Sequence, residues 1–448
     1  MKKYPAYQNV KGTFYEQLPS DWQQLYLKQI CSEKCVKNKD NAEINVLSLS
    51  YGNIIKKRNI NSGLSPKDFA TYQVVQPNDI ILRLTDLQND HKSLRTGLSE
   101  QTGIITSAYT CLTKIKNSRF LHYALHAMDL NKIFYRLGSG VRQSLSYGDI
   151  RYLPIPAPPT PEQQQIVRYL DWKTSQINHL IHGYERLISL LEERKTAVIN
   201  EAVTKGIRKG IVMKDSGVNW IDEIPSHWNM VYSKQLFALR KDRAFPEDEQ
   251  LTSSQKYGII SQQEFMEKEG RRVTVVLKGE DILKHVEKGD FVISMRSFQG
   301  GLEYSYVSGK ISSAYVMLIP HHEHVYDEYY KWLFKSPSYI KALQGTSDLV
   351  RDGQALRYSN FAKVYLPQLP IEEQKEIAEY IAENVSRIEN AMIPIKAQID
   401  FLRERRTRLI SDVVTGVMDV RGIEVPEYTP EQDVEVTEDG DEYEGERA

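Results

Sequence analysis

Two groups of histidines are the strongest candidates for metal chemistry in this 448-residue chain. His122 and His126 lie four residues apart, which on a helix places both rings on one face with the spacing of a zinc pair. The residues between them lack the glutamate of H-E-x-x-H, and the aligned positions in the second half hold Glu328 and Trp332. A His-His-Glu-His run at 321–324 has no distant partner. We therefore predict no metal site.

Motifs for nucleotide, methyl-transfer or nuclease chemistry are also weak. The sequence has no G-x-x-x-x-G-K-[ST] loop and no G-x-G-x-x-G motif. It lacks the Asn or Asp followed by Pro-Pro and an aromatic residue with which amino-methyltransferases hold a flipped base. A nuclease-like Glu-x-Lys at Glu193–Lys195 falls inside a predicted coiled coil, where charged flanks are ordinary. We expect no catalytic activity from this chain alone.

What remains is binding chemistry. Arginine can donate two hydrogen bonds to guanine in the DNA major groove, and lysine can hold phosphates. Gln143 and Gln354, at matching positions of an internal repeat, could pair with adenine or could cap a turn. For each basic residue, a solvated surface charge is the alternative. The candidate DNA-binding residues at predicted loops are Lys56, Lys57, Arg58, Arg83, Arg95, Arg142, Gln143, Arg271, Arg272, Arg296, Arg351, Gln354 and Arg357.

The elements that must position these loops are two copies of one long amphipathic helix. Residues 162–204 align without a gap with residues 373–415, and 14 of the 43 positions are identical. At ~1.5 Å per residue such a helix would run roughly 65 Å, too long to be buried in one small domain. The two copies can supply both strands of a coiled coil.

Apolar residues recur at every seventh position of both copies, which predicts a helix-pairing seam. A neighbouring stripe at Ile181, Ile188, Met392 and Ile399 predicts partner helices packed alongside, with contact to this chain's own domains as the alternative. The seam residues are Leu170, Ile177, Tyr184, Leu191, Val198, Ile381, Ile388, Ile395, Leu402 and Leu409.

The repeat extends into the globular parts. LPSDW at 18–22 aligns with IPSHW at 224–228, and NDIILRL at 78–84 aligns with GDFVISM at 289–295. The sequence thus predicts an α+β chain with a pseudo-two-fold internal repeat: two globular α/β domains separated by two long helices that form an antiparallel coiled coil. The expected segments are domains 1–160 and 213–371, spacer helices 161–212 and 372–423, and a disordered acidic tail, 424–448.

Composition sets further bounds. The net charge of -1 combines 11 acidic residues and one arginine at 424–448 with a body of charge +9, which suits a polyanionic partner.

Three cysteines, Cys31, Cys35 and Cys111, cannot form a disulfide framework, and Cys111 aligns with Met317 as an expected core position. No apolar run is long enough to span a bilayer, and we expect a cytoplasmic protein without a membrane partner.

The whole plan resembles the specificity subunit of type I restriction–modification systems. The match covers residues 4–423, and only the acidic tail falls outside the pattern. It is carried by the proline-rich connectors at 153–161 and 366–370, by Glu162-Gln163 and Glu373-Gln374, by Tyr169-Leu170 and Tyr380-Ile381, and by the helix ends Val203-Thr204 and Val414-Thr415.

The resemblance implies that 1–160 and 213–371 are target recognition domains that read a split, asymmetric site on double-stranded DNA. It also implies docking of two modification (methyltransferase) subunits and, through them, two restriction (motor-nuclease) subunits. S-adenosylmethionine, ATP and Mg are expected on those partners, with no cofactor on this chain. The alternative from another class is a coiled-coil scaffold that bridges protein partners without DNA.

Overall fold

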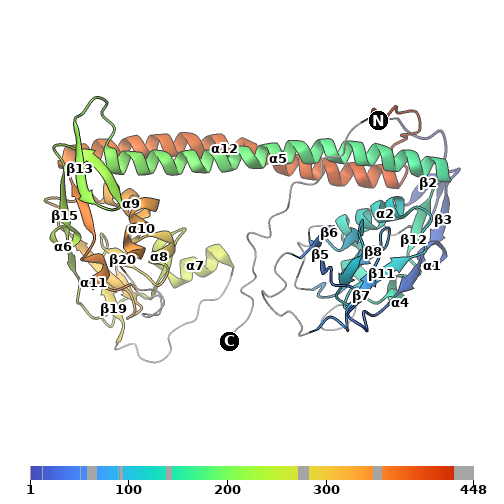
Figure 1. The fold of residues 1–448 in the computed structure, drawn as a ribbon, viewed down its shortest axis with the longest axis horizontal. Helices are drawn as coiled ribbons and strands as arrows, with labels where there is room; N and C mark the ends of the chain where they lie inside the picture. Colours follow the sequence, from blue (N-terminus) through green and yellow to red (C-terminus); the bar gives the residue numbers. More distant parts are fainter. Residues whose placement is uncertain are drawn as a thin grey trace. The chain divides into compact units, whose positions relative to one another are not determined.

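The computed structural model describes residues 2–12, 14–50, 52–57, 68–88, 90, 94–137, 144–270, 282–346 and 356–427 (Figure 1). The chain divides into two compact units. Unit 1 is Met1–Tyr184 with Ala397–Ala448, and unit 2 is Glu185–Lys396. Each unit contains one globular part and one part of each long helix.

The two long helices are α5 (Thr160–Lys205) and α12 (Ile371–Val414). Both end before the predicted limits of 212 and 423, because Gly206 and Gly416 follow in the left-handed conformation, each with φ of 74°. Glycine adopts this conformation without steric cost and commonly ends a helix. A Cβ atom on Gly416 would lie 2.4 Å from Pro19, so no larger residue fits at this end.

The helices pair in antiparallel orientation within each unit. In unit 2, Lys195 meets Glu389 at 3.5 Å, and Arg208, 13 residues later, meets Glu376, 13 residues earlier, at 2.7 Å. In unit 1, Gln165 reaches the carbonyl of Ile423, while Arg406 donates to Asn178. The predicted antiparallel coiled coil is therefore confirmed.

The seam uses two positions per heptad. Ile181, Met392 and Ile399 are at most 5 % exposed, as deeply buried as the seam residues themselves, and Ile188 is half-buried. They lie three or four residues from seam residues and alternate with them as the second core position of a coiled coil. The prediction that this stripe receives further helices is wrong. Of the predicted seam, Leu170, Ile177, Val198, Ile381 and Leu402 are buried, and Tyr184, Leu191, Ile388, Ile395 and Leu409 are partly buried.

The globular part of unit 1 contains a six-stranded sheet of order β4-β11-β8-β9-β6-β5, with the pairs β1-β2, β7-β10 and β3-β12 beside it. Its strands are β1 (Tyr7–Asn9), β2 (Gln17–Pro19), β3 (Gln23–Tyr26), β4 (Ser32–Lys34), β5 (Leu47–Ser50), β6 (Asn53–Lys56), β7 (Gln73–Val75), β8 (Ile80–Leu82), β9 (Thr96–Leu98), β10 (Gly103–Ile105), β11 (Thr110–Thr113) and β12 (Pro154–Ala157). Its helices are α1 (Leu27–Ile30), α2 (Ser118–Leu130), α3 (Ile133–Leu137) and α4 (Tyr147–Ile150).

Unit 2 repeats this plan with a four-stranded sheet of order β16-β23-β20-β21 and the pairs β13-β14, β15-β24, β17-β18 and β19-β22. Its strands are β13 (Met213–Val218), β14 (Ile221–Pro225), β15 (Asn229–Tyr232), β16 (Phe237–Leu239), β17 (Leu251–Ser254), β18 (Gly258–Ser261), β19 (Lys284–Val286), β20 (Phe291–Ile293), β21 (Glu303–Tyr304), β22 (Gly309–Ile311), β23 (Val316–Pro320) and β24 (Tyr365–Gln368). Its helices are α6 (Ser233–Leu236), α7 (Gln262–Glu269), α8 (Ser297–Gly300), α9 (Asp327–Lys335), α10 (Pro337–Gln344) and α11 (Tyr358–Phe361).

The internal repeat is visible in the cores. Trp22 and Trp228, aligned in the sequence, are both at most 2 % exposed. Cys111 and Met317 are buried on the equivalent strands β11 and β23, which confirms the core position expected for Cys111. In both units the central strand pair, β8-β11 or β20-β23, is antiparallel. The globular parts of the two units therefore share one arrangement of central strands and core residues.

Within the described residues, no helix has an apolar stretch that could cross a membrane. The acidic tail was predicted to be disordered from residue 424 onward, and residues 428–448 of it lie outside the described part of the chain.

Candidate nucleic-acid interface

The first candidate residues lie at an edge of the unit 1 sheet. Lys56 ends β6, the strand that pairs with the edge strand β5, and its side chain is exposed. Lys57 follows, half-buried, and its backbone N–H donates to the carbonyl of Val46 at 2.8 Å. The ladder thus fixes the backbone and leaves the Lys56 charge free to meet a polyanion.

Arg83 follows the central strand β8 and is 28 % exposed at its side chain. Its guanidinium lies 3.2 Å from the carboxylate of Asp90, so in this structure it is held against its own loop. A contact with DNA would compete with this pair.

Arg95 is buried, which corrects its assignment as a DNA contact. Its side chain is 0 % exposed and donates to the carbonyls of Thr85 at 2.7 Å, of Asp86 at 3.2 Å and of Asp90. Its Nε also donates to the Tyr135 hydroxyl at 3.2 Å. A guanidinium with all its donors turned inward cannot reach a base; Arg95 instead holds the loop that follows Arg83.

In unit 2, Arg296 and Arg357 are both exposed. Arg296 follows β20, the strand equivalent to β8, and precedes the short helix α8, and Arg357 precedes α11. The other seven candidates lie outside the described residues and stay predictions: Arg58, Arg142, Gln143, Arg271, Arg272, Arg351 and Gln354.

A turn with a buried ion pair supports the central strand in each unit. In unit 1, Lys34 lies 2.6 Å from Asp79, whose carboxylate also accepts the N–H of Gln76. In unit 2, Arg240 donates to both carboxylate oxygens of Asp290, at 2.6 and 3.0 Å. Because these pairs occupy aligned positions, the same support sits before β8 and before β20.

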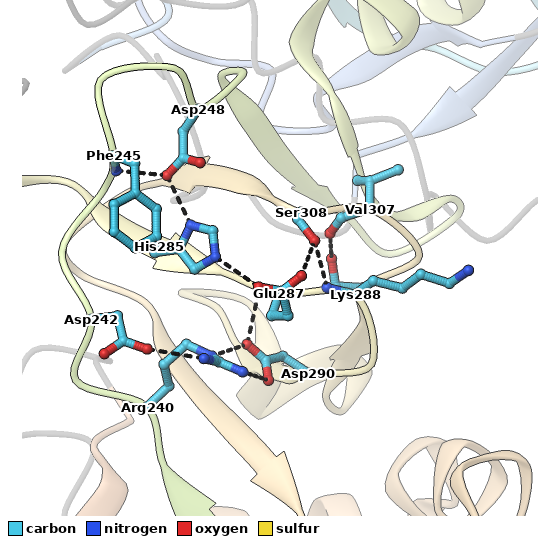
Figure 2. A network of polar contacts seen from close by, with 11 residues as sticks. Arg240, Asp242, Phe245, Asp248, His285, Glu287, Lys288, Asp290, Val307 and Ser308 are labelled. Atoms are coloured by element: carbon cyan, nitrogen blue, oxygen red, sulfur yellow. Dashed lines mark hydrogen bonds and ion pairs between the residues drawn. The ribbon is translucent and has the colours of Figure 1, made fainter.

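Unit 2 adds a histidine to this support (Figure 2). His285 on β19 contacts Asp248 through Nδ1 at 2.8 Å and Glu287 through Nε2 at 3.0 Å. The backbone N–H of Lys288 donates to Ser308, whose hydroxyl donates to Glu287. The network joins β19 to the segments that precede β17, β20 and β22. In Figure 2 the exposed side chain of Lys288 extends away from it, a further candidate cation at a fixed position.

The two carboxylates decide the charge of His285. Burial works to lower the pKa of the imidazole, but hydrogen bonds to Glu287 and Asp248 outweigh it, and the pKa of His285 is raised. The same contact with His285, together with Ser308, lowers the pKa of Glu287. Both shifts favour a charged pair within the turn.

The histidines considered for metal binding are packed on α2. The rings of His122 and His126 stack with centroids 5.8 Å apart, and burial lowers the pKa of His122 to about 4 and of His126 to about 3. His126 Nδ1 lies 3.2 Å from the Thr96 hydroxyl. Across the residues with a described placement, no group of three or more His, Cys, Asp and Glu side chains could hold a metal ion.

Both repeats match one known family. The family described as type I restriction modification DNA specificity domain matches residues 19–183 and 225–398, which is one match for each repeat. The chain belongs to this DNA specificity family. Membership assigns it to DNA sequence recognition as a non-catalytic component of a type I restriction–modification system.

Similar proteins extend over nearly the whole chain. A putative type I restriction enzyme MjaX specificity subunit from Methanocaldococcus jannaschii is 22 % identical and covers 92 % of this chain and 97 % of that protein. The MjaVIII specificity subunit of the same organism is 22 % identical over 78 % of this chain and 81 % of its own length. A solved chain from a study of complex assembly and conformational transition of the type I R-M system superposes with a TM-score of 0.61 at 14 % identity, covering 90 % of this chain and 99 % of that chain, and supports the fold.

Sequence reasoning missed a surface feature that this specificity-family chain carries twice. In unit 1, the exposed rings of Tyr26 and Tyr152 lie 6.0 Å apart, and the ammonium of Lys28 lies 4.2 Å from the centre of the Tyr152 ring. In unit 2, the rings of Tyr232 and Tyr365 lie 4.1 Å apart, with Lys234 5.3 Å from Tyr232. We call these the aromatic–cation clusters.

A signal for these clusters was present in the sequence. Tyr26 and Lys28 align with Tyr232 and Lys234 at one constant offset. Exposed tyrosines beside cations are typical of interfaces with partners. The Tyr-x-Lys pattern at the same place in both repeats is therefore the sequence signal for these clusters.

The spacer helices carry a second exposed feature. Leu180, Leu187 and Leu190 of α5 are 50, 41 and 52 % exposed, whereas their neighbours Ile177 and Ile181 are buried in the seam. Apolar side chains that face solvent along one helix are typical of a surface that another element covers.

Proposed function

We propose that this chain is the DNA sequence-recognition subunit of a type I restriction–modification complex, with each globular part reading one half of a split, asymmetric duplex site. One observation carries the proposal: both units build the same turn and the same central strands, yet differ in the exposed residues that follow them. After β8 the chain presents Arg83 paired with Asp90, and after β20 it presents the exposed Arg296. Different side chains on one framework would read different bases.

We further propose that the paired helices set the distance between the two half-sites. The support is the length of α5 and α12, 46 and 44 residues, and their antiparallel pairing by a seam that recurs in every heptad. A coiled coil of this kind resists bending more than a loop connection would.

The expected partners are two modification subunits and, through them, two restriction subunits. The duplicated aromatic–cation clusters support a partner present in two copies, because one surface offered twice fits the same protein twice. The exposed leucines of α5 would be covered by such a partner. S-adenosylmethionine, ATP and Mg would be bound by those subunits.

A footprinting experiment tests this function. The purified chain together with its modification subunit is incubated with a library of duplexes, and the bound sequences are determined. We expect two short protected tracts separated by a gap whose sequence does not matter. The affinity should fall steeply as salt is raised, because phosphate contacts release counterions. Equal binding to scrambled duplexes at every salt concentration would refute sequence recognition.

The same assay tests the alternative of a scaffold without DNA contact. A scaffold would hold the modification subunit in a gel-shift assay and leave the duplex unbound whatever its sequence. A purified chain that cuts or methylates DNA alone would contradict the assignment of chemistry to the partners.

A further inference from the structure

A groove of about 390 Å³ lies on the paired helices of unit 1. Its apolar lining includes Ile177 and Leu180 of α5, Leu402 and Leu409 of α12, and Met418 beyond α12. The exposed Leu180 and the partly buried Leu409 thus form an apolar surface here, beside the buried seam residues Ile177 and Leu402.

The rim of this groove is cationic. Lys173, Arg405 and Arg408 line it, together with a single carboxylate, Asp412. Asp412 is engaged by Arg408 at 3.6 Å, and Arg405 forms no ion pair with a described residue. Burial and the nearby Arg405 charge lower the pKa of Lys173, so the two cations repel one another in the absence of an anion. An apolar floor with an uncompensated positive rim fits an acidic peptide that also carries apolar side chains.

The chain itself contains such a peptide. Residues 428–448 hold nine Asp or Glu and one Arg, with Val434, Val436 and Tyr443 spaced among them. The rest of the chain carries the opposite net charge. The acidic tail and the cationic rim of the groove therefore attract one another within one molecule.

The path to the groove is short. The carbonyl of Ile423 accepts a hydrogen bond from Gln165 on α5 at 2.6 Å. Gln176 at the groove is eleven residues further along the same helix, roughly 17 Å at ~1.5 Å per residue. The eleven residues from Ile423 to Val434 can span up to about 36 Å when extended. The tail therefore reaches the groove without any rearrangement of the body.

We propose that the groove lined by Lys173, Arg405 and Leu409 is a docking site for the acidic tail of the same chain. Val434 and Val436 would cover the apolar floor while the flanking carboxylates pair with the rim. In this state the tail masks a basic, apolar patch of the spacer helices and competes with any other acidic or apolar ligand for it. The inference does not depend on the proposed function.

Photo-crosslinking of the full chain tests the contact. A benzophenone amino acid replaces Val436, the free protein is irradiated, and the joined peptides are identified by mass spectrometry. Crosslinks to residues 169–180 or 402–418 are expected. Mixing isotopically light and heavy protein before irradiation distinguishes contacts within one chain from contacts between chains. Crosslinks spread over other surfaces, or formed between chains, would overturn the proposal.

Charge reversal supplies the matched control. The double variant R405E/R408E should reduce the crosslink at least about twofold, because two exposed ion pairs are each worth about 0.2–1 kcal/mol. The variant K396E, an exposed charge change on α12 that lies outside the groove lining, should leave it unchanged. An equal loss of the crosslink in both variants, or no loss in either variant, would contradict a specific contact.

A second measurement distinguishes the tail from nucleic acid as occupant. The reactivity of Lys173 toward an amine reagent is compared in the wild-type chain and in a variant whose nine tail acids are changed to Asn or Gln. Greater reactivity in the neutral variant supports tail docking. Equal reactivity that falls only when duplex DNA is added would assign the groove to DNA instead.

Discussion

The buried Arg95 side chain holds a neighbouring loop in place and does not itself face solvent. Its guanidinium donates hydrogen bonds to the backbone carbonyls of Thr85, Asp86 and Asp90. Replacing it with methionine keeps much of the volume but leaves those acceptors buried without donors. The free energy of unfolding of R95M is expected to fall by about 3 kcal/mol, measured by urea denaturation of the full chain.

The exposed Arg296 is the matched control. R296M should change the unfolding free energy by less than about 0.5 kcal/mol, because the side chain is exposed. It should instead weaken binding to the specific duplex by about 1–3 kcal/mol if the arginine reads a base. A stable R95M protein would show that the loop does not need its guanidinium.

His285 should give unit 2 a pH-dependent stability. Because the folded-state pKa of His285 is raised, its stabilising effect is complete below its ordinary value of 6.5 and is lost as the pH rises through the folded value. The difference in unfolding free energy between wild type and H285Q should therefore be larger at pH 6 than at pH 9. H324Q, a change at an exposed histidine, is the control. A difference that grows with pH would mean that His285 is neutral in the fold.

Residue types alone could not predict which of the candidate residues are exposed. Lys56, Arg296 and Arg357 are exposed as a binding role requires, whereas Arg95 is buried. Nothing in the sequence distinguishes Arg95 from the others, because its burial depends on the backbone carbonyls of Thr85, Asp86 and Asp90, whose positions a residue pattern does not give. The contribution of His285 was also invisible, since Asp248 lies 37 residues away in the chain.

At the scale of the elements, two faces of α5 have separate tasks. Ile181 is 5 % exposed in the seam, and Leu187 is 41 % exposed on the outer face. I181D buries a charge and should destabilise the helix pair by at least about 3 kcal/mol, measured by thermal or chemical unfolding.

The same substitution on the outer face should have the opposite pattern. L187D should leave the stability of the free chain unchanged within about 0.5 kcal/mol and weaken co-purification of the modification subunit. Wild-type affinity for that subunit in L187D would remove the outer face from the interface.

The helix pair also predicts the gap in the DNA site. A seven-residue insertion after Ile188 of α5, matched by one after Lys396 of α12, keeps the antiparallel register and adds roughly 10 Å at ~1.5 Å per residue. At ~3.4 Å per base pair the gap should lengthen by about 3 base pairs, read from the selected sequences. The single insertions, which misalign the seam, serve as controls for register. An unchanged gap would refute the spacer role.

The long helices were the most predictable elements because an apolar residue recurs at five successive heptad positions in each of them. The period identified the seam but only half of its core, since one residue per heptad was counted where a coiled coil buries two. The helix ends were less predictable. Gly206 and Gly416 end the helices through their φ angles, and the apolar residues beyond them continue the pattern without continuing the helix.

At the scale of the whole molecule, the two repeats should be exchangeable as modules. Replacing residues 1–160 with the corresponding domain of another family member should change one half of the recognised site and leave the other half and the gap intact. The measurement is the set of adenines methylated in cells that express the hybrid with its modification subunit. Changes in both halves would mean that the units do not read independently.

The duplicated plan could be predicted from the sequence, because an offset of 206 or 211 residues connects most of the equivalent strands. The aligned ion pairs, Lys34–Asp79 and Arg240–Asp290, obey these offsets as well. The alignment of the two repeats could not predict the structure of the loops in which the repeats differ. The exposed loops diverge, and seven of their thirteen candidate residues lie outside the described chain.

The ends of the helices have a topological consequence. After Gly206 the chain runs covalently into β13 and β14, and Trp228 packs 3.4 Å from the position of a Gly206 Cβ. After Gly416 the equivalent strands are β1 and β2, with Trp22 at the same 3.4 Å. There the joint is made without a peptide link, by the Tyr7 hydroxyl on the Gly416 carbonyl and by the N–H of Asp419 on the carbonyl of Lys2. The joint after Gly416 is therefore the non-covalent equivalent of the covalent joint after Gly206, and a circularly permuted chain that is linked at the first and opened at the second should keep the contacts of both.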